Sequence, residues 1–217
     1  DQKLFGEAVT DQIDVGSDYL ISFEVGGKNN NYQWLFTEDD SGNDLIKQVN
    51  SSSLLIDAIG FEEMGHYVLE VRNELVDDLI LKSQPQSIFA QADITIAPVY
   101  RDIDNEESLL ENGDAQGELY KVKPNGKYQA VGDTIGIENN HLTFENIRLG
   151  DYVVIVRPLD TLLIKDNKGR NDSIRILPTY YPSTIDWIEA AIIELRDPFE
   201  DSVFMEQQPR PLPDIPD

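Results

Sequence analysis

Short runs of alternating hydrophobic and polar residues recur along the chain, and turn-forming residues separate them. In the first half the runs cover residues 18–25, 32–36, 53–56, 66–72, 79–82 and 92–97. Glycines such as Gly26, Gly27 and Gly60 stand between them and mark turns. Strands alternate with a period of two residues, and the long amphipathic pattern of a helix is missing. The pattern therefore predicts an all-β fold of sandwiches or barrels.

A second series of β-prone runs follows at residues 117–122, 128–132, 141–144 and 151–157. An acidic, loop-like stretch at 101–114 separates the two series, and we place a domain boundary near Ala97-Pro98. This predicts two tandem β-sandwiches, at residues 1–96 and 97–197. Residues 198–217 contain five prolines and few core-forming residues, so we predict a proline-rich linker or a disordered tail.

Residues 183–190 form the one segment that is compatible with a short helix. Ser183 is a suitable N-cap, and Asp186 would face the positive end of the helix dipole. The adjoining run 191–195 is β-prone, so a final strand in this region is the alternative.

The spacing of aromatic residues in the first half resembles that of an immunoglobulin-like sandwich. Trp34 stands where strand C carries its tryptophan, and Glu63-Met64-Gly65-His66-Tyr67 is similar to the tyrosine corner. Phe23 and Leu69 occupy the two positions at which an immunoglobulin domain usually has its cysteines. Both replacements are apolar, so we expect packing to take the place of the disulfide.

The resemblance extends to residues 15–17, 26–34 and 71–76. These segments are similar to an immunoglobulin-like module that lies beside leucine-rich repeats in secreted proteins of environmental gram-negative bacteria. The resemblance implies an extracellular or cell-surface location, with neighbouring modules in the same parent chain. A fold of this kind does not by itself identify a ligand.

The second half resembles prealbumin-like sandwiches of the collagen-binding B-type, or carboxypeptidase-regulatory-like, kind. The pattern is Phe144-x-Asn146-Ile147-x-x-Gly150-x-Tyr152-x-Val154, and residues 178–184 and 187–190 add to it. Phe144 and Ile147 are expected to point inward before a turn at Gly150. The resemblance implies a stalk, a spacer or a binding platform.

The charge of the chain limits its partners. It has 41 acidic and 17 basic side chains, a formal net charge of -24 and no cysteine. We therefore expect no nucleic-acid partner, no disulfide and no thiolate site. No apolar run approaches the length of a membrane helix, so no membrane insertion is expected.

Alternating carboxylates in the acidic stretch are the candidate cation site. Asp102, Asp104, Glu106 and Glu107 could converge on Ca²⁺ in a loop, since calcium prefers oxygen ligands. The glycine of an EF-hand loop is absent, and a solvated acidic loop is the alternative. Calcium is the only cofactor that the sequence suggests.

Aromatic residues near the end of the second domain are the candidate binding residues. Tyr180 and Tyr181, together with Trp187, could stack on a sugar ring. Such residues more often cover one end of a core, and we interpret Trp187 in that way.

No catalytic constellation is evident, so we expect no enzyme. The two histidines, His66 and His141, fall in different predicted domains, and neither a Gly-x-Ser-x-Gly elbow nor a phosphate loop occurs. We predict a non-catalytic adhesive or architectural segment of a larger extracellular bacterial protein, which binds an extracellular protein or glycan or acts as a spacer. The alternative is a carbohydrate-binding accessory region of a secreted polysaccharide-degrading enzyme.

Overall fold

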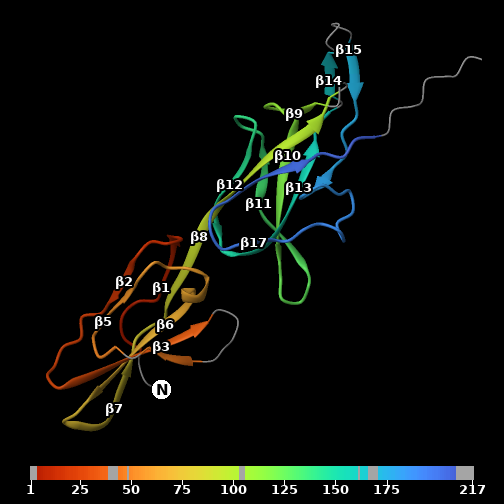
Figure 1. Cartoon of the computed structure of the whole chain (residues 1–217). Coiled ribbons are helices and arrows are strands. Elements are labelled where there is room, and N and C mark those ends of the chain that lie inside the picture. Colours follow the sequence, from red (N-terminus) through yellow and green to blue (C-terminus); the bar gives the residue numbers. More distant parts are fainter. Residues whose placement is uncertain are drawn as a thin grey trace, which may run out of the picture. The chain divides into compact units, whose positions relative to one another are not determined.

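The computed structural model describes residues 4–38, 44–47, 49–102, 106–160, 162–165 and 171–208. Over these residues the regular structure consists of strands and one 3-10 turn, η1 (Phe61–Glu63), so the all-β prediction is confirmed (Figure 1). Contacts divide the chain into two compact units. Unit 1 comprises residues 1–92 with 146–149, and unit 2 comprises 93–145 with 150–217. The division falls inside one strand, β8 (Gln86–Arg101), whereas the sequence suggested a boundary at residues 96–97.

Unit 1 consists of two sheets. Its strands are β1 (Val9–Asp14), β2 (Tyr19–Ser22), β3 (Asn30–Glu38), β4 (Asp44–Lys47), β5 (Ser53–Ile56), β6 (Gly65–Asn73), β7 (Val76–Lys82) and the first part of β8. One sheet has the order β1-β8-β6-β3-β4 with β7 on β6, and the other pairs β2 with β5. The β1–β8 pair is parallel, and the others are antiparallel. Together with the core described next, this arrangement is an immunoglobulin-like sandwich.

The core of unit 1 is built around Trp34. Its side chain is fully buried, and Leu69 lies directly opposite it in the β3–β6 register. The Phe23 ring stacks on the indole with ring centroids 5.9 Å apart. The indole Nε1 donates a hydrogen bond to the Ser51 carbonyl at 2.9 Å, which satisfies its single polar group. The predicted burial of Trp34 and Leu69 is confirmed, whereas Phe23 contacts Trp34 as predicted but is itself only half-buried.

The tyrosine corner is also confirmed. The Tyr67 hydroxyl donates a hydrogen bond to the Glu63 carbonyl at 2.7 Å, and the Tyr67 ring lies 4.7 Å from that of Phe36. Burial raises the pKa of Tyr67, so its hydroxyl stays protonated and remains a donor. The bond ties the start of β6 to the turn before it.

Gly65 permits the close approach of β6 to β3 beside this corner. A Cβ atom at this position would lie 2.3 Å from the Thr37 carbonyl oxygen and 2.7 Å from the Phe36 ring. The first of these atoms is backbone in a paired strand and has little room to move. Any larger residue would therefore push the two strands apart.

Unit 2 uses the rest of β8 and the strands that follow it. These are β9 (Glu107–Leu109), β10 (Ala115–Val122), β11 (Tyr128–Gly136), β12 (Leu142–Arg148), β13 (Gly150–Pro158), β14 (Leu162–Lys165), β15 (Asn171–Ile174), β16 (Thr179–Tyr180), β17 (Ile193–Leu195) and β18 (Phe199–Phe204). One sheet has the order β11-β10-β13-β16, with β17 also on β13. β9, β12 and β18 pair with β8, and β14 and β15 form a separate hairpin.

The strand β13 lies at the centre of unit 2. Its residues from Tyr152 to Val156 are all buried, as are Leu142 and Phe144 on β12. A Cβ atom at Gly117 of β10 would lie 3.0 Å from both Leu142 and Phe144, so the two layers are in close contact there. The inward positions predicted for Phe144 and Tyr152 are confirmed, whereas Ile147 is only half-buried.

Two predictions for the end of the chain are wrong. Residues 183–190 form turns instead of a helix, and the alternative, a strand, is found as β17. Residues 199–204 are not a linker, because they form β18 and pair in parallel with β8. Val203 and Met205 are buried and give this segment its apolar anchors. The prolines that suggested a linker lie mostly at 209–217, outside the described residues.

We expect Gly65→Ala to lower the free energy of unfolding of unit 1 by about 3 kcal/mol, because the methyl group must displace paired backbone. The measurement is urea denaturation followed by the fluorescence of buried Trp34 in a Trp187→Phe background. Gly26→Ala is the matched control, since a Cβ there meets nothing within 4 Å. Equal stability losses in the two variants would contradict the close approach.

Candidate binding surface

The acidic stretch lies beside the end of β8 and is partly described. The Asp102 carboxylate accepts a hydrogen bond from the Glu106 backbone at 2.9 Å, and Glu107 lies 3.7 Å from the Arg101 guanidinium. Asp104 lies outside the described residues. Within the described ranges, no group of three His, Asp or Glu side chains is placed to hold a metal ion. Calcium binding by Asp102, Asp104, Glu106 and Glu107 therefore stays a prediction.

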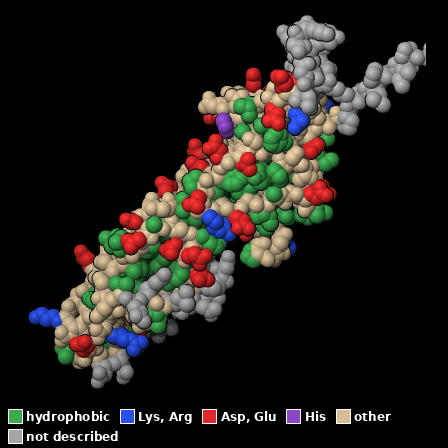
Figure 2. Space-filling view, viewed as in Figure 1, with side chains coloured by type: hydrophobic (Ala, Val, Ile, Leu, Met, Phe, Trp, Pro, Cys, Tyr) green, Lys and Arg blue, Asp and Glu red, His purple; other side chains and the backbone are tan. Residues whose placement is uncertain are grey.

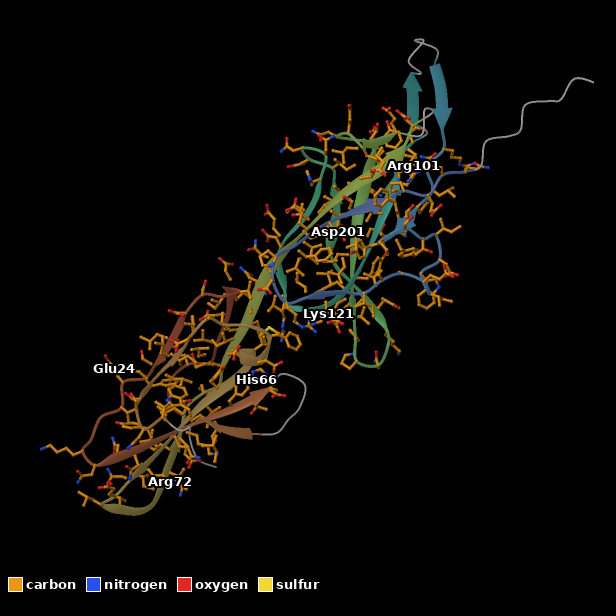
Figure 3. All side chains as sticks on the ribbon, viewed as in Figure 1. Glu24, His66, Arg72, Arg101, Lys121 and Asp201 are labelled. Atoms are coloured by element: carbon orange, nitrogen blue, oxygen red, sulfur yellow. The ribbon has the colours of Figure 1, made fainter. Side chains whose placement is uncertain are left out.

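A polar pocket of about 740 Å³ opens near this stretch, between the ends of β8 and β18. Arg101, labelled in Figure 3, lines it together with Asp102 and Glu107. Ser183, also on its wall, is hydrogen-bonded to the Phe204 carbonyl at 2.9 Å. The pocket combines both signs of charge, and the Ser183 hydroxyl also lies 3.2 Å from the Glu206 carboxylate on the same wall.

A second polar pocket, of about 680 Å³, carries mainly negative charge. Glu138, Glu145 and Glu200 line it together with His141, whose Nδ1 lies 2.8 Å from the Asn139 carbonyl. Figure 2 shows Asp and Glu side chains over much of the visible face, with few Lys or Arg side chains among them. Anionic ligands are repelled by such a surface.

The tyrosines singled out in the sequence are both half-buried. The Tyr181 hydroxyl donates to the Asp201 carboxylate at 2.5 Å, and its ring meets Phe199 edge-on at 5.7 Å (Asp201 is labelled in Figure 3). Burial and the Asp201 hydrogen bond raise the pKa of Tyr181 to about 12. Tyr180 pairs with Ile155 through the backbone. A binding role for these two residues stays a prediction.

The exposed aromatic surface of unit 2 lies instead at Trp187 and Tyr128. Trp187 is 53% exposed and Tyr128 is 41% exposed, and their rings meet at 5.5 Å with an interplanar angle of 89°. Ile185 and Ile188 in the same turn segment are 61% and 74% exposed. The interpretation of Trp187 as a core residue is therefore wrong. Exposed apolar side chains in one place are typical of an interaction site.

A Tyr–Glu–Arg cluster lies on the sheet of unit 2. The Glu118 carboxylate accepts hydrogen bonds from the Tyr120 hydroxyl at 2.6 Å and from Arg157 Nε at 2.7 Å. A second Arg157 nitrogen approaches the other carboxylate oxygen at 3.4 Å, so the ion pair is bidentate. The Tyr120 hydrogen bond, followed by the Arg157 contacts, holds the pKa of Glu118 below its usual value.

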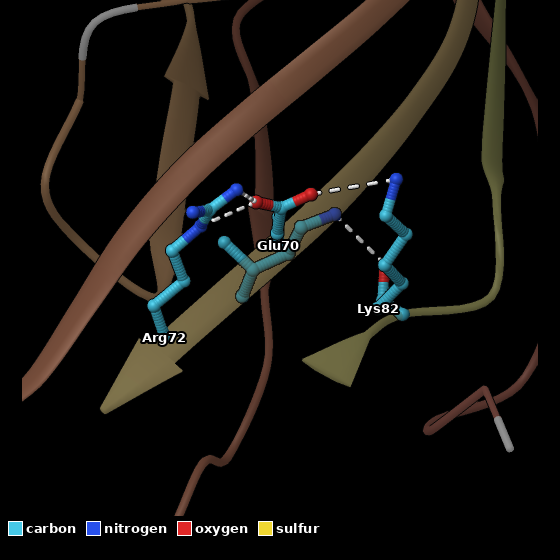
Figure 4. Close-up of polar contacts among 5 residues, drawn as sticks. Glu70, Arg72 and Lys82 are labelled. Carbon is cyan, nitrogen blue, oxygen red and sulfur yellow. Dashed lines mark hydrogen bonds and ion pairs between the residues drawn. The ribbon is translucent and has the colours of Figure 1, made fainter. Parts of the chain in front are cut away.

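Unit 1 contains a comparable cluster at Glu70, which is 7% exposed. Arg72 approaches its carboxylate at 2.7 Å and Lys82 at 3.4 Å (Figure 4). His66, also in unit 1, shares a hydrogen bond with Ser87 through Nδ1 at 2.7 Å. These groups are paired within the sheet, and the two cationic side chains offset the cost of burying the Glu70 carboxylate.

The comparisons with known proteins concern the fold. No protein-family model and no curated protein matches the chain. The structure of the N-terminal four immunoglobulin domains of Dscam1 isoform 8.4 aligns with a TM-score of 0.38 and 14% identity, over 71% of this chain and 42% of that one. Sidekick-1 immunoglobulin domains 1–5 align with a TM-score of 0.34 and 12% identity, over 90% and 36%.

This chain thus spans less than half the length of either structure. Similarity at this level does not establish a shared function. The assignment of unit 1 to the immunoglobulin-like sandwiches rests on its strand order, its Trp34 core and its tyrosine corner. No helix among the described residues is long and apolar enough to cross a membrane.

We expect Glu118→Gln to destabilise unit 2 by about 1 kcal/mol at pH 7, since the ion pair is half-exposed and screened. The folded-state pKa of Glu118 is lowered, so its contribution is present above the ordinary pKa of 4.5 and is lost as the pH falls through the folded value. The difference between variant and parent should therefore shrink in acid. The rate of hydrogen exchange at the buried β13 amides, compared between variant and parent from pH 7 to pH 3, measures this difference in unfolding free energy.

Glu107→Gln is the control for this measurement. The Glu107 carboxylate is 3.7 Å from the Arg101 guanidinium, and both side chains are 55% exposed. We therefore expect Glu107→Gln to lower the free energy of unfolding by less than about 0.5 kcal/mol at any pH. A difference for Glu118→Gln that stays constant from pH 7 to pH 3 would contradict the assigned pKa direction.

Proposed function

We propose that this chain is a non-catalytic binding segment, adhesive or architectural, of a larger extracellular protein. The observation that carries the proposal is the exposed pair Tyr128–Trp187, whose rings contact each other outside the buried core of unit 2. A half-exposed indole lowers the solubility of a protein unless a partner covers it. The sandwich below it provides a rigid support of the kind on which binding surfaces are usually built.

The polar clusters support a binding role over catalysis. The carboxylates of Glu70 and Glu118 are engaged by cationic partners, and His66 shares a hydrogen bond with Ser87. A catalytic acid or nucleophile needs a free or strongly activated group in a cleft, and these groups are held within the sheets or at their ends. The high negative charge favours solubility in a secreted setting and discourages non-specific association with anionic surfaces.

A carbohydrate-binding accessory region of a polysaccharide-degrading enzyme is the second candidate. The perpendicular rings of Tyr128 and Trp187 favour it, because the flat apolar face of a sugar complements an aromatic face. The two candidates share the same surface and differ in the parent protein. The domains encoded on either side of this chain would distinguish them.

We expect Trp187→Ala to weaken binding of the full chain to its surface ligand at least tenfold without altering its thermal unfolding, because Trp187 is outside the core. The assay is binding of immobilised protein to an array of cell-surface glycans and extracellular proteins. Leu75→Ala, at a side chain that is 75% exposed in unit 1, is the control and should bind as the parent does.

Two results would count against the proposal. One is an array on which every bound ligand is retained equally by Trp187→Ala and the parent. The other is chemical conversion of any array ligand by the purified chain, which would reveal an enzyme.

A further inference from the structure

The outer face of β10 continues the exposed aromatic surface. Along this strand Ala115, Gly117 and Leu119 are buried, and the alternate residues face the other way. These alternate residues are half-buried, and they are Gln116, Glu118, Tyr120 and Val122. The strand therefore presents one face to the core and a second, polar and aromatic face to the other side of the sheet. This second face is partly covered, because Val153 and Ile155, which lie opposite Tyr120 and Glu118 on β13, are buried.

The strand register places the two aromatic groups on this same face. Tyr128 pairs with Val122, and Ala130 pairs with Tyr120, in the antiparallel β10–β11 ladder. Directly opposed residues share a face, and diagonal neighbours are within reach of aromatic side chains. Tyr128 therefore lies diagonally next to Tyr120, and its ring contacts Trp187. Lys121, labelled in Figure 3, pairs with buried Tyr152 and belongs to the opposite face.

We group these neighbouring residues, which register and side-chain contacts place next to one another, as the outer-face strip. It consists of Trp187, Tyr128, Tyr120, Glu118 and Arg157. From Val122, the partner of Tyr128, to Glu118 it follows four residues of β10, or about 13 Å. The strip thus begins with two perpendicular rings, continues with a phenol, and ends in a bidentate ion pair. Its length suits a short oligosaccharide.

The charge of the strip selects among ligands. Glu118 and Arg157 neutralise each other at 2.7 Å, so the strip itself has no net charge. The turn segment that carries Trp187 adds two carboxylates, Asp186 and Glu189, and no cation. An anionic ligand would meet these carboxylates, whereas an uncharged ligand with many hydroxyl groups would not be repelled.

We propose that the outer-face strip binds a neutral polysaccharide, with Trp187 and Tyr128 stacking on sugar rings and the Tyr120–Glu118–Arg157 cluster exchanging hydrogen bonds with sugar hydroxyls. This assignment rests on the proposed binding role and adds the class of ligand. The ion pair holds the carboxylate and guanidinium in fixed orientation, so that their remaining lone pairs and N–H groups are presented to the ligand without further ordering. The binding residues would therefore be largely preorganised.

The experiment uses the full chain and neutral hexasaccharides of β-1,4-glucan, xylan, mannan and α-1,4-glucan, with a hexauronate as the anionic probe. Trp187 is the exposed one of the two tryptophans, so its fluorescence reports occupancy while buried Trp34 stays constant. Calorimetric titration gives the Kd. We expect at least one neutral hexasaccharide to bind, and the hexauronate to bind at least tenfold more weakly.

Variants then locate the site. We expect Trp187→Ala and Tyr128→Ala each to weaken binding about tenfold or more, in keeping with the loss of one stacked ring. Trp187→Phe should restore part of the affinity, since it keeps a ring. Phe61→Ala is the matched control, because Phe61 is 39% exposed against 41% for Tyr128 and lies in unit 1. Tyr120→Phe should weaken binding less than loss of a ring does.

The outcomes separate the two proposals. If no neutral hexasaccharide binds, or if the hexauronate binds as well, the assignment of a neutral glycan is overturned. If Trp187→Ala instead abolishes binding to a protein, to a cationic ligand or to a second copy of this chain, the glycan assignment fails while the binding role stands. If Phe61→Ala weakens saccharide binding as much as Tyr128→Ala does, the outer-face strip is not the site.

Discussion

The packing of Trp34 between Phe23 and Leu69 is the interaction on which unit 1 depends. An immunoglobulin domain usually joins its two sheets by a disulfide beside the tryptophan. Here the chain has no cysteine, and contact between apolar side chains must hold the sheets together. Such contact is strong only at close range, so the strands around it have to approach tightly. The glycine at position 65 and the hydrogen bond from Tyr67 to Glu63 keep β6 close to the strand and the turn beside it.

Much of this could be predicted from sequence because the buried positions have a fixed spacing. Trp34, Tyr67 and Leu69 are rare or bulky residues at the places where one fold needs them, and alternation assigns the rest to a face. The strand β18 was missed for the opposite reason. Its residues 199–204 alternate only weakly, and the prolines around them suggested a linker, whereas long-range pairing with β8 decides their structure.

The candidate surface was harder to predict than the fold. A tryptophan in a β-rich sequence is usually in or near a core, and nothing in the identity of Trp187 separates the exposed case from the buried one. Tyr128 gave no signal of its own, because its exposure follows from the position of β11 at the edge of its sheet. The acid–base pairing of Glu118 with Arg157 joins residues 39 positions apart, which a single sequence does not reveal. The strand register places these residues next to one another, and the composition of the chain does not reveal it.

The parallel pairing of β18 with β8 has a consequence for how the protein is made. Phe199 pairs with Ile94, 105 positions earlier in the chain, and Val203 supplies a fully buried side chain to the same layer. Contacts between such distant positions form late, because a long segment must be ordered before they contribute. During synthesis the position beside β8 that β18 fills stays empty until residues 199–204 have left the ribosome. The pairing of β8 is therefore completed only after β18 has been translated, and until then this edge of β8 is available to wrong partners.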